Sequence, residues 1–355
     1  MRRLILGLAT LFTASSAEAQ APPDGRIVDS VRCAAHNLSH EQYVSRYEDV
    51  RRANLAANDS IFRVRSRTKS DTVEYEGARR ELLSRQPMPK EIFDSTLHSG
   101  RYECLKIKYM SDGLRVAGFI FRPALQPGRR YPVIIYNRGG NREFGAVSDL
   151  QMSWWLRFLD EGYVVVASQY RGVDGGEGRE EFGGADVDDV VNLIPLVRSL
   201  SYADTSNVFM DGASRGGMMA YIALARGMPV NAAVVEYAPV DLAGQQRFRP
   251  GFDELWAEMI PDFARHRQEF YRSRSAILWA ERLHTPLLIL QGTADWRVDP
   301  RDALRMADRL QQLGRPYSLV MYAGDDHGLP KSRLDREQRI LEWFRAYRAP
   351  AASRP

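Results

Sequence analysis

One serine stands where a strand-like run gives way to a helix-like run. The segment Gly212-Ala213-Ser214-Arg215-Gly216-Gly217 follows the apolar residues 208–210 and precedes residues 218–221, which suit a helix. This order is typical of a nucleophile elbow, a turn so tight that glycine is needed wherever a side chain would collide. The turn presents the serine hydroxyl at the sheet edge, and the helix N-terminus can stabilise a developing oxyanion. The pattern predicts Ser214 as the nucleophile of an acyl-transfer reaction.

A base for this serine is sought among the six histidines of the chain. In the fold that carries a nucleophile elbow, the catalytic residues follow the order nucleophile, acid, base. Five histidines are set aside because they precede Ser214, lie in a predicted insertion, or precede a strand at the wrong end of the sheet: His36, His40, His98, His266 and His284. His327 follows the last predicted strand, at the end where parallel sheets hold their chemistry. We therefore expect His327 to be the general base.

The acid of such a triad is expected after the penultimate strand, within residues 291–298. Asp295 stands there, and a buried carboxylate would hold the imidazole in the required tautomer and stabilise its cationic form. Glu236 stays open as an alternative because it also ends a predicted strand. The remaining competitors are Asp241, Asp325 and Asp326, of which the last two are too close to His327 along the backbone to orient it easily.

The loop at residues 137–141 is expected to complete an oxyanion hole. It follows the first central parallel strand, and its glycines allow backbone amides to face the site. We expect the amides of Arg215, Arg138 and Gly139 to hold the oxyanion. The Arg138 side chain either clamps a substrate carboxylate or holds the loop through a salt bridge, and Trp296 is a second candidate for substrate contact. Cys and His lack the spacing of metal ligands, so we expect neither a metal nor a cofactor.

The elements that must position these residues alternate between strands and helices from residue 101 onward. Residues 105–109 and 114–121 flank Ser111-Asp112-Gly113 and predict a hairpin. Further strands are expected at 131–136, 163–167, 208–211, 232–236, 287–290 and 317–322, with helices at 150–160, 186–200, 216–225, 300–313 and 334–347. This order predicts an α/β-hydrolase fold over residues 101–350, with a mostly parallel sheet and helices on both faces. Residues 242–283 break the rhythm with aromatic and charged side chains, which predicts a lid insertion.

The N-terminal part of the chain contains no catalytic motif. Met1-Arg2-Arg3, the apolar run 4–14 and Ala17-Glu18-Ala19 are typical of a signal peptide over residues 1–19, so we expect an exported protein, periplasmic or secreted. The apolar run is too short for a stable membrane anchor. Residues 20–100 predict helices, because Tyr43, Tyr47, Val50 and Leu55 recur at roughly helical spacing. This segment is expected to be a small cap or an arm packed on the main domain.

Bulk composition excludes some classes of partner. The formal net charge is +4, without a block of consecutive basic residues, so nucleic-acid binding is not indicated. The oligomeric state cannot be read from the sequence.

The two cysteines, Cys33 and Cys104, both follow the leader and predict one disulfide in an oxidising compartment. The alternative is two unrelated buried thiols.

Together, these motifs resemble the catalytic domain of the prolyl oligopeptidase family of serine peptidases, which includes dipeptidyl and acylaminoacyl peptidases. The elbow at 212–217, the acid loop at 291–295 and the Asp-His-Gly base loop at 326–328 follow the family order. Residues 169–172 with 183–189, and residues 237–241, are also similar, so that the resemblance covers roughly residues 101–348. The chain departs from the family in two ways: too few residues precede this domain for a β-propeller, and Asn137 and Arg138 stand where relatives commonly have His.

The resemblance implies a serine-type peptidase that cleaves short peptides through an acyl-enzyme. A carboxylesterase that hydrolyses small esters would use the same triad, because a fold does not identify a substrate. A third possibility is a non-catalytic binding protein on a hydrolase scaffold, which the intact set of Ser214, Asp295 and His327 argues against.

Overall fold

A computed structural model describes residues 22–65, 69–84 and 86–350, and the expected signal peptide at residues 1–19 lies outside these ranges. A nine-stranded sheet with the order β1-β2-β3-β5-β4-β6-β7-β8-β9 runs through the molecule. Its first three pairings are antiparallel, and β5, β4, β6, β7, β8 and β9 are parallel neighbours. The strands are β1 (Ile27–Arg32), β2 (Tyr102–Ser111), β3 (Leu114–Pro123), β4 (Tyr131–Asn137), β5 (Val164–Ser168), β6 (Ala203–Ala213), β7 (Ala233–Glu236), β8 (Leu287–Gly292) and β9 (Tyr317–Tyr322).

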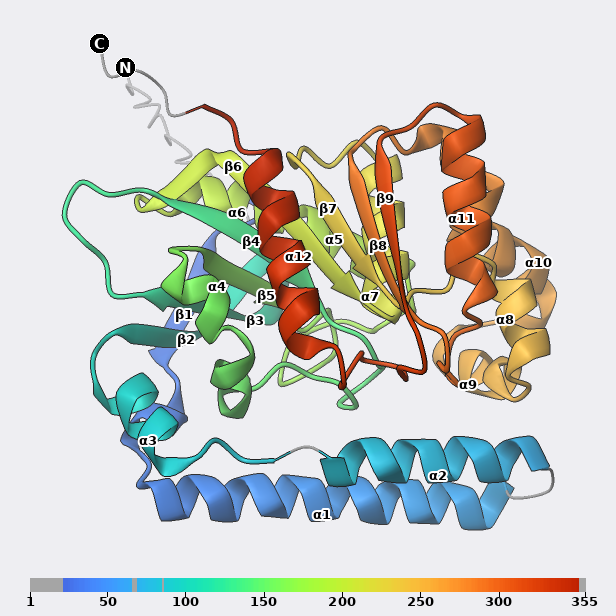
Figure 1. The fold of residues 1–355 in the computed structure, drawn as a ribbon, viewed down its shortest axis with the longest axis horizontal. Helices are drawn as coiled ribbons and strands as arrows, with labels where there is room; N and C mark the ends of the chain where they lie inside the picture. The colour runs from blue at the N-terminus through green and yellow to red at the C-terminus, as the bar shows by residue number, and fades with distance from the viewer. Residues whose placement is uncertain (1–21, 66–68, 85, 351–355) are drawn as a thin grey trace, which may run out of the picture.

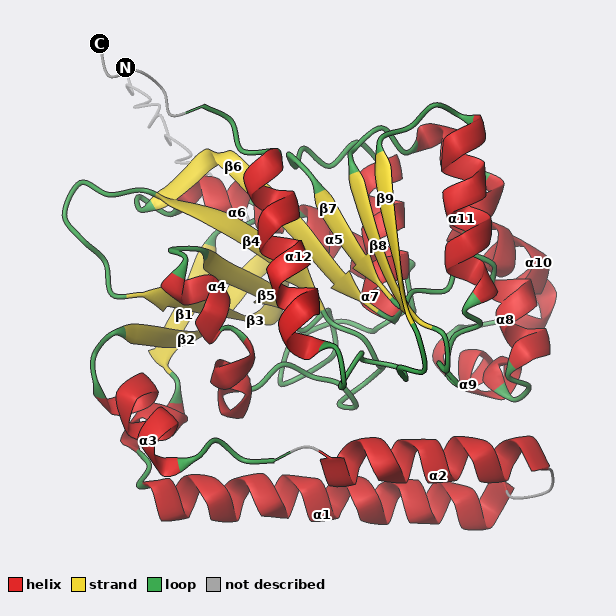
Figure 2. Cartoon of the chain, viewed as in Figure 1, coloured by secondary structure: helices red, strands yellow, loops and turns green. Residues whose placement is uncertain are grey.

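Helices cover both faces of this sheet (Figures 1 and 2). They are α1 (His40–Arg65), α2 (Lys69–Ser84), α3 (Lys90–Phe93), α4 (Leu156–Asp160), α5 (Asp186–Val191), α6 (Leu193–Ser199), α7 (Arg215–Ala225), α8 (Leu242–Phe248), α9 (Phe252–Met259), α10 (Phe263–Arg274), α11 (Arg301–Gln312) and α12 (Arg333–Ala346). Successive strand residues face opposite sides, so Met210 belongs to the core that includes residues of α5, α6, α7 and α11, whereas Phe209 belongs to the core that includes residues of α4 and α12. Burial on both faces explains why the central strands read as continuous apolar runs. The expected α/β-hydrolase architecture is confirmed.

The segment expected to be helical contains one strand. Residues 27–32 form β1, which pairs antiparallel with β2 at the sheet edge, so the sheet begins well before residue 101. Five of the six β1 residues are exposed, which means that no buried apolar face marks this strand in the sequence. Backbone pairing with β2 holds it instead. Close by, Cys33 and Cys104 form a disulfide with a Cα–Cα distance of 5.3 Å.

Helices α1 and α2 run antiparallel as a long arm beneath the loops that follow the parallel strands (Figure 1). The base of the arm is anchored on the main domain by a buried tyrosine and an ion pair. The Tyr43 hydroxyl donates to the Leu150 carbonyl at 3.4 Å and accepts from the Met88 amide at 3.1 Å. Arg46 pairs with Asp149 at 3.2 Å. The arm is therefore attached at its base to the segment that follows the oxyanion loop.

The insertion at residues 242–283 forms α8, α9 and α10, which lie together beside α11 (Figure 1). Its centre is Trp256, which is fully buried and stacks on Phe252, with ring centroids 5.1 Å apart. Phe182 of the main domain contacts Trp256 edge-on at 5.8 Å. The insertion therefore has an aromatic core of its own that continues into the main domain. None of the described helices is long and apolar enough to cross a membrane.

Candidate active site

Ser214 lies at the sharp turn between β6 and α7. Its backbone has φ 56° and ψ −124°, a conformation that non-glycine residues rarely adopt and that marks a strained functional turn. A Cβ on Gly212 would lie 2.7 Å from the Gly216 carbonyl oxygen, and one on Gly216 would lie 2.0 Å from the Asn137 carbonyl oxygen. Both glycines are therefore required by close backbone approach. The Ser214 amide donates to the Glu236 carbonyl at 2.8 Å, which fixes the turn against β7.

His327 and Asp295 form a buried pair after β9 and β8. The His327 Nδ1 atom lies 2.9 Å from Asp295 Oδ2 and 3.1 Å from Oδ1. The carboxylate is itself held in place: Oδ1 accepts from the Arg297 and Val298 amides at 2.8 and 2.9 Å, and Oδ2 accepts from Gln291 Nε2 at 3.0 Å. With Nδ1–H donated to Asp295, the other ring nitrogen is free to accept a proton.

Tyr237 links the nucleophile and the base. It follows Glu236, whose carbonyl holds the Ser214 amide, and its ring packs edge-on against the His327 ring at 4.7 Å. Its φ of 39° lies in the left-handed region, so the backbone turns sharply where β7 ends. Residues 236 and 237 thus contact Ser214 on one side and His327 on the other. The sequence placed Tyr237 in a family-like segment but did not reveal this role.

The other candidate acids have partners away from the imidazole ring. Glu236 forms an ion pair with Arg336 at 3.4 Å. Asp241 caps α8 by accepting from the Gly244 amide at 3.0 Å. The Asp325 side chain accepts hydrogen bonds from the backbone amides of Asp326, Lys331 and Ser332. The Asp326 side chain accepts one from the His327 amide. Of the five carboxylates considered, Asp295 is the one that contacts the His327 side chain.

The loop after β4 passes directly beside the nucleophile. A Cβ on Gly139 would lie 3.1 Å from Ser214 Cβ and 3.7 Å from its Oγ. The Arg138 side chain is fully buried and donates to backbone carbonyls at 2.9–3.2 Å, those of Gln169, Arg142 and Gly139. A guanidinium enclosed in this way does not suit the substrate-carboxylate clamp that the sequence allowed. The side chain holds the loop instead, through these carbonyl oxygens and through the expected kind of salt bridge, which it forms with Glu180 at 3.7 Å.

Arg215, next to the nucleophile, is held by a buried network. Its guanidinium donates to the Gly140 carbonyl at 3.1 Å and forms ion pairs with Glu180 and Asp186. The Tyr170 ring lies close to both this guanidinium and that of Arg138, and its hydroxyl donates to the Arg138 carbonyl at 2.9 Å. These contacts fix the two segments expected to supply oxyanion donors. No pattern in the sequence points to Glu180 and Asp186 as members of this network, because both lie in a polar, glycine-rich stretch.

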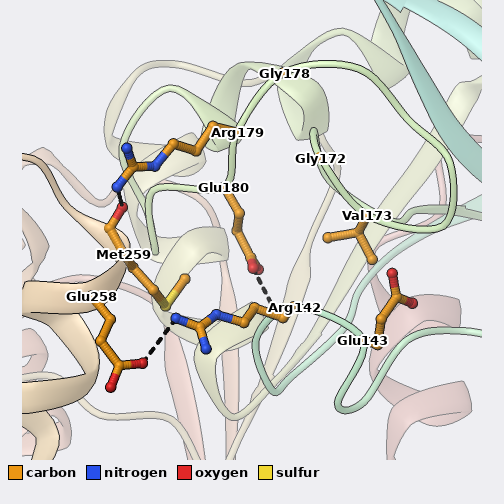
Figure 3. Close-up of a pocket in the computed structure, with 9 residues that line it drawn as sticks. All are labelled: Arg142, Glu143, Gly172, Val173, Gly178, Arg179, Glu180, Glu258 and Met259. Atoms are coloured by element: carbon orange, nitrogen blue, oxygen red, sulfur yellow. Dashed lines mark hydrogen bonds and ion pairs between the residues drawn. The ribbon is translucent and has the colours of Figure 1, made fainter.

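A cavity of about 220 Å³ adjoins the far end of the same loop (Figure 3). Arg142 lines this cavity. Its backbone amide donates to the Glu180 carboxylate at 2.6 Å, and its guanidinium donates to the carboxylate of Glu258 in α9 at 3.1 Å. Arg179 donates to the Met259 carbonyl across the cavity. The insertion is thus joined to the oxyanion loop by charged contacts around a polar space.

Trp296, the second candidate for substrate contact, lies where the acid loop meets the arm. The Arg297 guanidinium lies 4.5 Å from the Trp296 ring and 5.4 Å from the exposed Phe144 ring of the oxyanion loop. A Cβ on Gly77 of α2 would lie only 2.3 Å from the indole of Trp296. We call Phe144, Trp296 and Arg297 the aromatic rim. This rim connects the oxyanion loop, the acid loop and the arm.

A second contact joins the arm to the base loop. Arg80 of α2 pairs with Asp326 at 3.4 Å, and Asp326 precedes His327. The arm therefore reaches both loops that supply the histidine–aspartate pair. In the described part of the chain, no group of three or more His, Cys, Asp or Glu side chains is placed to hold a metal ion.

Known proteins share this domain. A model of the prolyl oligopeptidase family matches residues 150–350. An uncharacterized peptidase, YtmA, of Bacillus subtilis is 28% identical over 241 residues, which are 67% of this chain and 92% of that protein. Dipeptidyl-peptidase 5 of Aspergillus fumigatus is 27% identical over 254 residues, which are 67% of this chain but 35% of that enzyme.

Solved structures show the same fold. The acylaminoacyl peptidase of Pyrococcus horikoshii superposes with a TM-score of 0.61 at 21% identity, over 74% of this chain and 45% of that one. The chain thus spans less than half of the acylaminoacyl peptidase and about a third of the dipeptidyl-peptidase. At this identity the structural likeness establishes the fold, and the family model establishes the kinship.

Proposed function

The chain belongs to the prolyl oligopeptidase family of serine hydrolases, and on that premise we propose that it cleaves short peptides with Ser214, His327 and Asp295 as catalytic triad. Peptidases are the relatives that share its domain. The observation that carries the proposal is the buried His327–Asp295 pair, joined through residues 236 and 237 to the strained Ser214 turn.

The proposed reaction is acyl transfer in two steps. His327 Nε2 takes the hydroxyl proton of Ser214 as Oγ attacks the peptide carbonyl carbon, and Asp295 stabilises the imidazolium. The amides of Arg215 and of the loop at residues 137–140 hold the oxyanion. His327 then gives its proton to the leaving amine as the peptide C–N bond breaks. In the second step, water attacks the acyl-enzyme with His327 again as base, releasing the acid and restoring Ser214.

The arm supports a preference for short peptides. Helices α1 and α2 lie beneath the loops of the site, and α2 contacts both the acid loop at Trp296 and the base loop at Asp326 (Figure 1). A folded polypeptide approaching from this side would collide with the arm, whereas a short extended peptide can pass beside it. The aromatic rim offers apolar contacts to one substrate side chain. The charged cavity at Arg142, Glu180 and Glu258 suits polar peptide groups better than an apolar ester.

Export to an oxidising compartment is part of the proposal. The N-terminal residues have the pattern of a signal peptide, and the Cys33–Cys104 disulfide supports export because such bonds persist mainly outside the cytoplasm. The disulfide ties the segment between β1 and the arm to β2, beside the anchor of the arm.

An active-site-directed fluorophosphonate tests the proposed triad directly. We expect one equivalent to attach to Ser214, located by mass spectrometry of the digested protein, because a nucleophile activated by a base is phosphonylated selectively. Ser214→Ala should take up none. Ser206, an exposed serine hydrogen-bonded to Asp204, provides the control, and Ser206→Ala should label like the wild type. Labelling that persists in Ser214→Ala would contradict the assignment.

A further inference from the structure

A buried charged cluster lies under the start of α12, next to the base loop but outside the proposed triad. Asp211 of β6 and Glu236 of β7 are 4% and 3% exposed. In the sheet register Asp211 pairs with Val234, and Ala213 pairs with Glu236. Asp211 and Glu236 therefore share one face of the sheet, since strand side chains alternate with a period of two. Tyr136 of β4 pairs with Asp211 and completes this face.

The two carboxyl groups cannot both be ionised without a cost, because among the described residues only one cation faces them. Arg336 of α12 provides it, with Nε 3.4 Å from Glu236 Oε2. Burial, together with the neighbouring Glu236, holds the pKa of Asp211 well above its usual range. Burial also raises the pKa of Glu236, while the nearby Arg336 guanidinium and Asp211 act in the opposite direction, so the two carboxyl groups together favour holding a proton beside Arg336. Glu337, the other acid near the cluster, is paired with Arg333 at 3.1 Å.

Arg336 also contacts the base loop. Its Nη1 donates to the Gly328 carbonyl at 3.0 Å, and Gly328 directly follows His327. The same cluster reaches the imidazole by a second route, because Glu236 precedes Tyr237, whose ring packs on His327. The ion pair with the buried Glu236 carboxylate restricts where the guanidinium can lie, and the guanidinium in turn restrains the Gly328 carbonyl to which it donates.

From these contacts we infer that Arg336, held by Glu236 and Asp211, is a positioning residue that fixes the His327 loop for proton transfer. This inference rests on the proposed function of His327 as the base. Arg336 has no contact with the imidazole ring among the described interactions, so it acts through Gly328. Asp295 sets the tautomer of the imidazole ring, and Arg336 fixes the position of the backbone that carries His327.

Substitutions on α12 test this role with p-nitrophenyl acetate as the probe substrate. Arg336→Met is expected to lower kcat on the order of 10- to 100-fold with KM nearly unchanged, because a displaced base slows the chemical step without removing a substrate contact. Arg336→Lys should restore part of the loss by keeping a cationic donor. The matched control is Arg339→Met, one turn along the same helix, which loses an exposed ion pair to Asp335. It should retain the wild-type kcat.

Two further measurements keep the outcomes separate. If Arg336→Met does not fold by circular dichroism, Glu236→Gln replaces it, since this change keeps the shape but removes the charge that holds Arg336. A kcat for a folded Arg336→Met or Glu236→Gln that equals the Arg339→Met value would overturn the positioning role. Fluorophosphonate labelling of wild-type Ser214 is measured in parallel. Wild-type protein that is not labelled contradicts the proposed triad, whereas labelled wild type with unaffected variants contradicts only the role of Arg336.

Discussion

The Asp295 carboxylate accepts hydrogen bonds from two backbone amides, from Gln291 and from His327, so its orientation depends on its being a pure acceptor. In Asp295→Asn the NH2 group must point either toward Gln291 and His327 or toward the Arg297 and Val298 amides, so a donor faces donors in either orientation. We expect the imidazole to adopt the wrong tautomer and kcat for p-nitrophenyl acetate to fall by roughly 10³- to 10⁴-fold, as for the equivalent change in another serine protease. Gln312→Glu, on the exposed face of α11, serves as the control for an acid–amide exchange. A loss of less than ten-fold would argue against Asp295 as the orienting acid.

At the residue scale, the sequence predicted candidate catalytic residues where chain order and glycine spacing limit which residues can take each role. Ser214, His327 and Asp295 follow from the elbow and from the order of the strands. Arg138 shows the limit, because a sequence does not tell whether an arginine points to solvent or to buried carbonyls. The roles of Tyr237 and Arg336 arise from contacts between segments far apart in the chain, which no local pattern records.

Among the elements, the arm has the least regular pattern in its sequence, yet its packing on the acid loop has a clear consequence for one residue of α2. Gly77 lies buried within α2, where glycine costs about 1 kcal/mol relative to alanine. The reason for its presence is the indole of Trp296, which leaves no room for a Cβ. The packing of the arm on the acid loop thus explains a residue that helix propensity disfavours.

Enlarging this glycine tests the arm as a restriction on substrate size. Gly77→Leu should force α2 away from Trp296, so the ratio of kcat/KM for a 20-residue peptide to that for a tetrapeptide should rise several-fold. The matched control is Glu76→Leu, at an exposed position on the same helix, which should leave the ratio unchanged. Equal ratios for both variants and the wild type would show that the arm does not limit access.

Among the strands and helices, the buried central strands and the amphipathic helices were predictable, because burial on two faces or on one face leaves a clear periodicity. Strand β1 was not, since five of its six residues are exposed and its stability comes from pairing with β2. The aromatic residues at 242–283 led to the prediction of an insertion, but the packing of this segment on Phe182 required the tertiary structure.

At the scale of the whole molecule, the cluster under α12 links stability to pH. The folded protein raises the pKa of Asp211 through burial and through Glu236, whereas in the unfolded chain the pKa of this carboxyl is about 4. Between these two values the folded state holds a proton that the unfolded state has released. The free energy of unfolding should therefore fall as pH rises through this window, by up to about 1.4 kcal/mol per pH unit from this group.

Asp211→Asn removes this contribution, because asparagine mimics the protonated acid and does not titrate. Urea unfolding of both proteins at several pH values should show the difference in unfolding free energy, variant minus wild type, increasing with pH above about 4. Glu236, Arg336 and Tyr136 face this position in both proteins, and Glu236 is the group whose own titration responds to the loss of the Asp211 carboxyl. Parallel curves for the two proteins would mean that Asp211 is not protonated in the folded state.

We propose above all that this molecule is a serine peptidase whose chemistry depends on Ser214. The most direct measurement is incubation of the purified protein with a mixed library of short peptides, read by mass spectrometry, beside Ser214→Ala. We predict that the wild type produces defined cleavage products and that the variant produces none. Peptides that survive intact, while the wild type still hydrolyses p-nitrophenyl acetate through Ser214, would contradict the claim and identify the protein as an esterase.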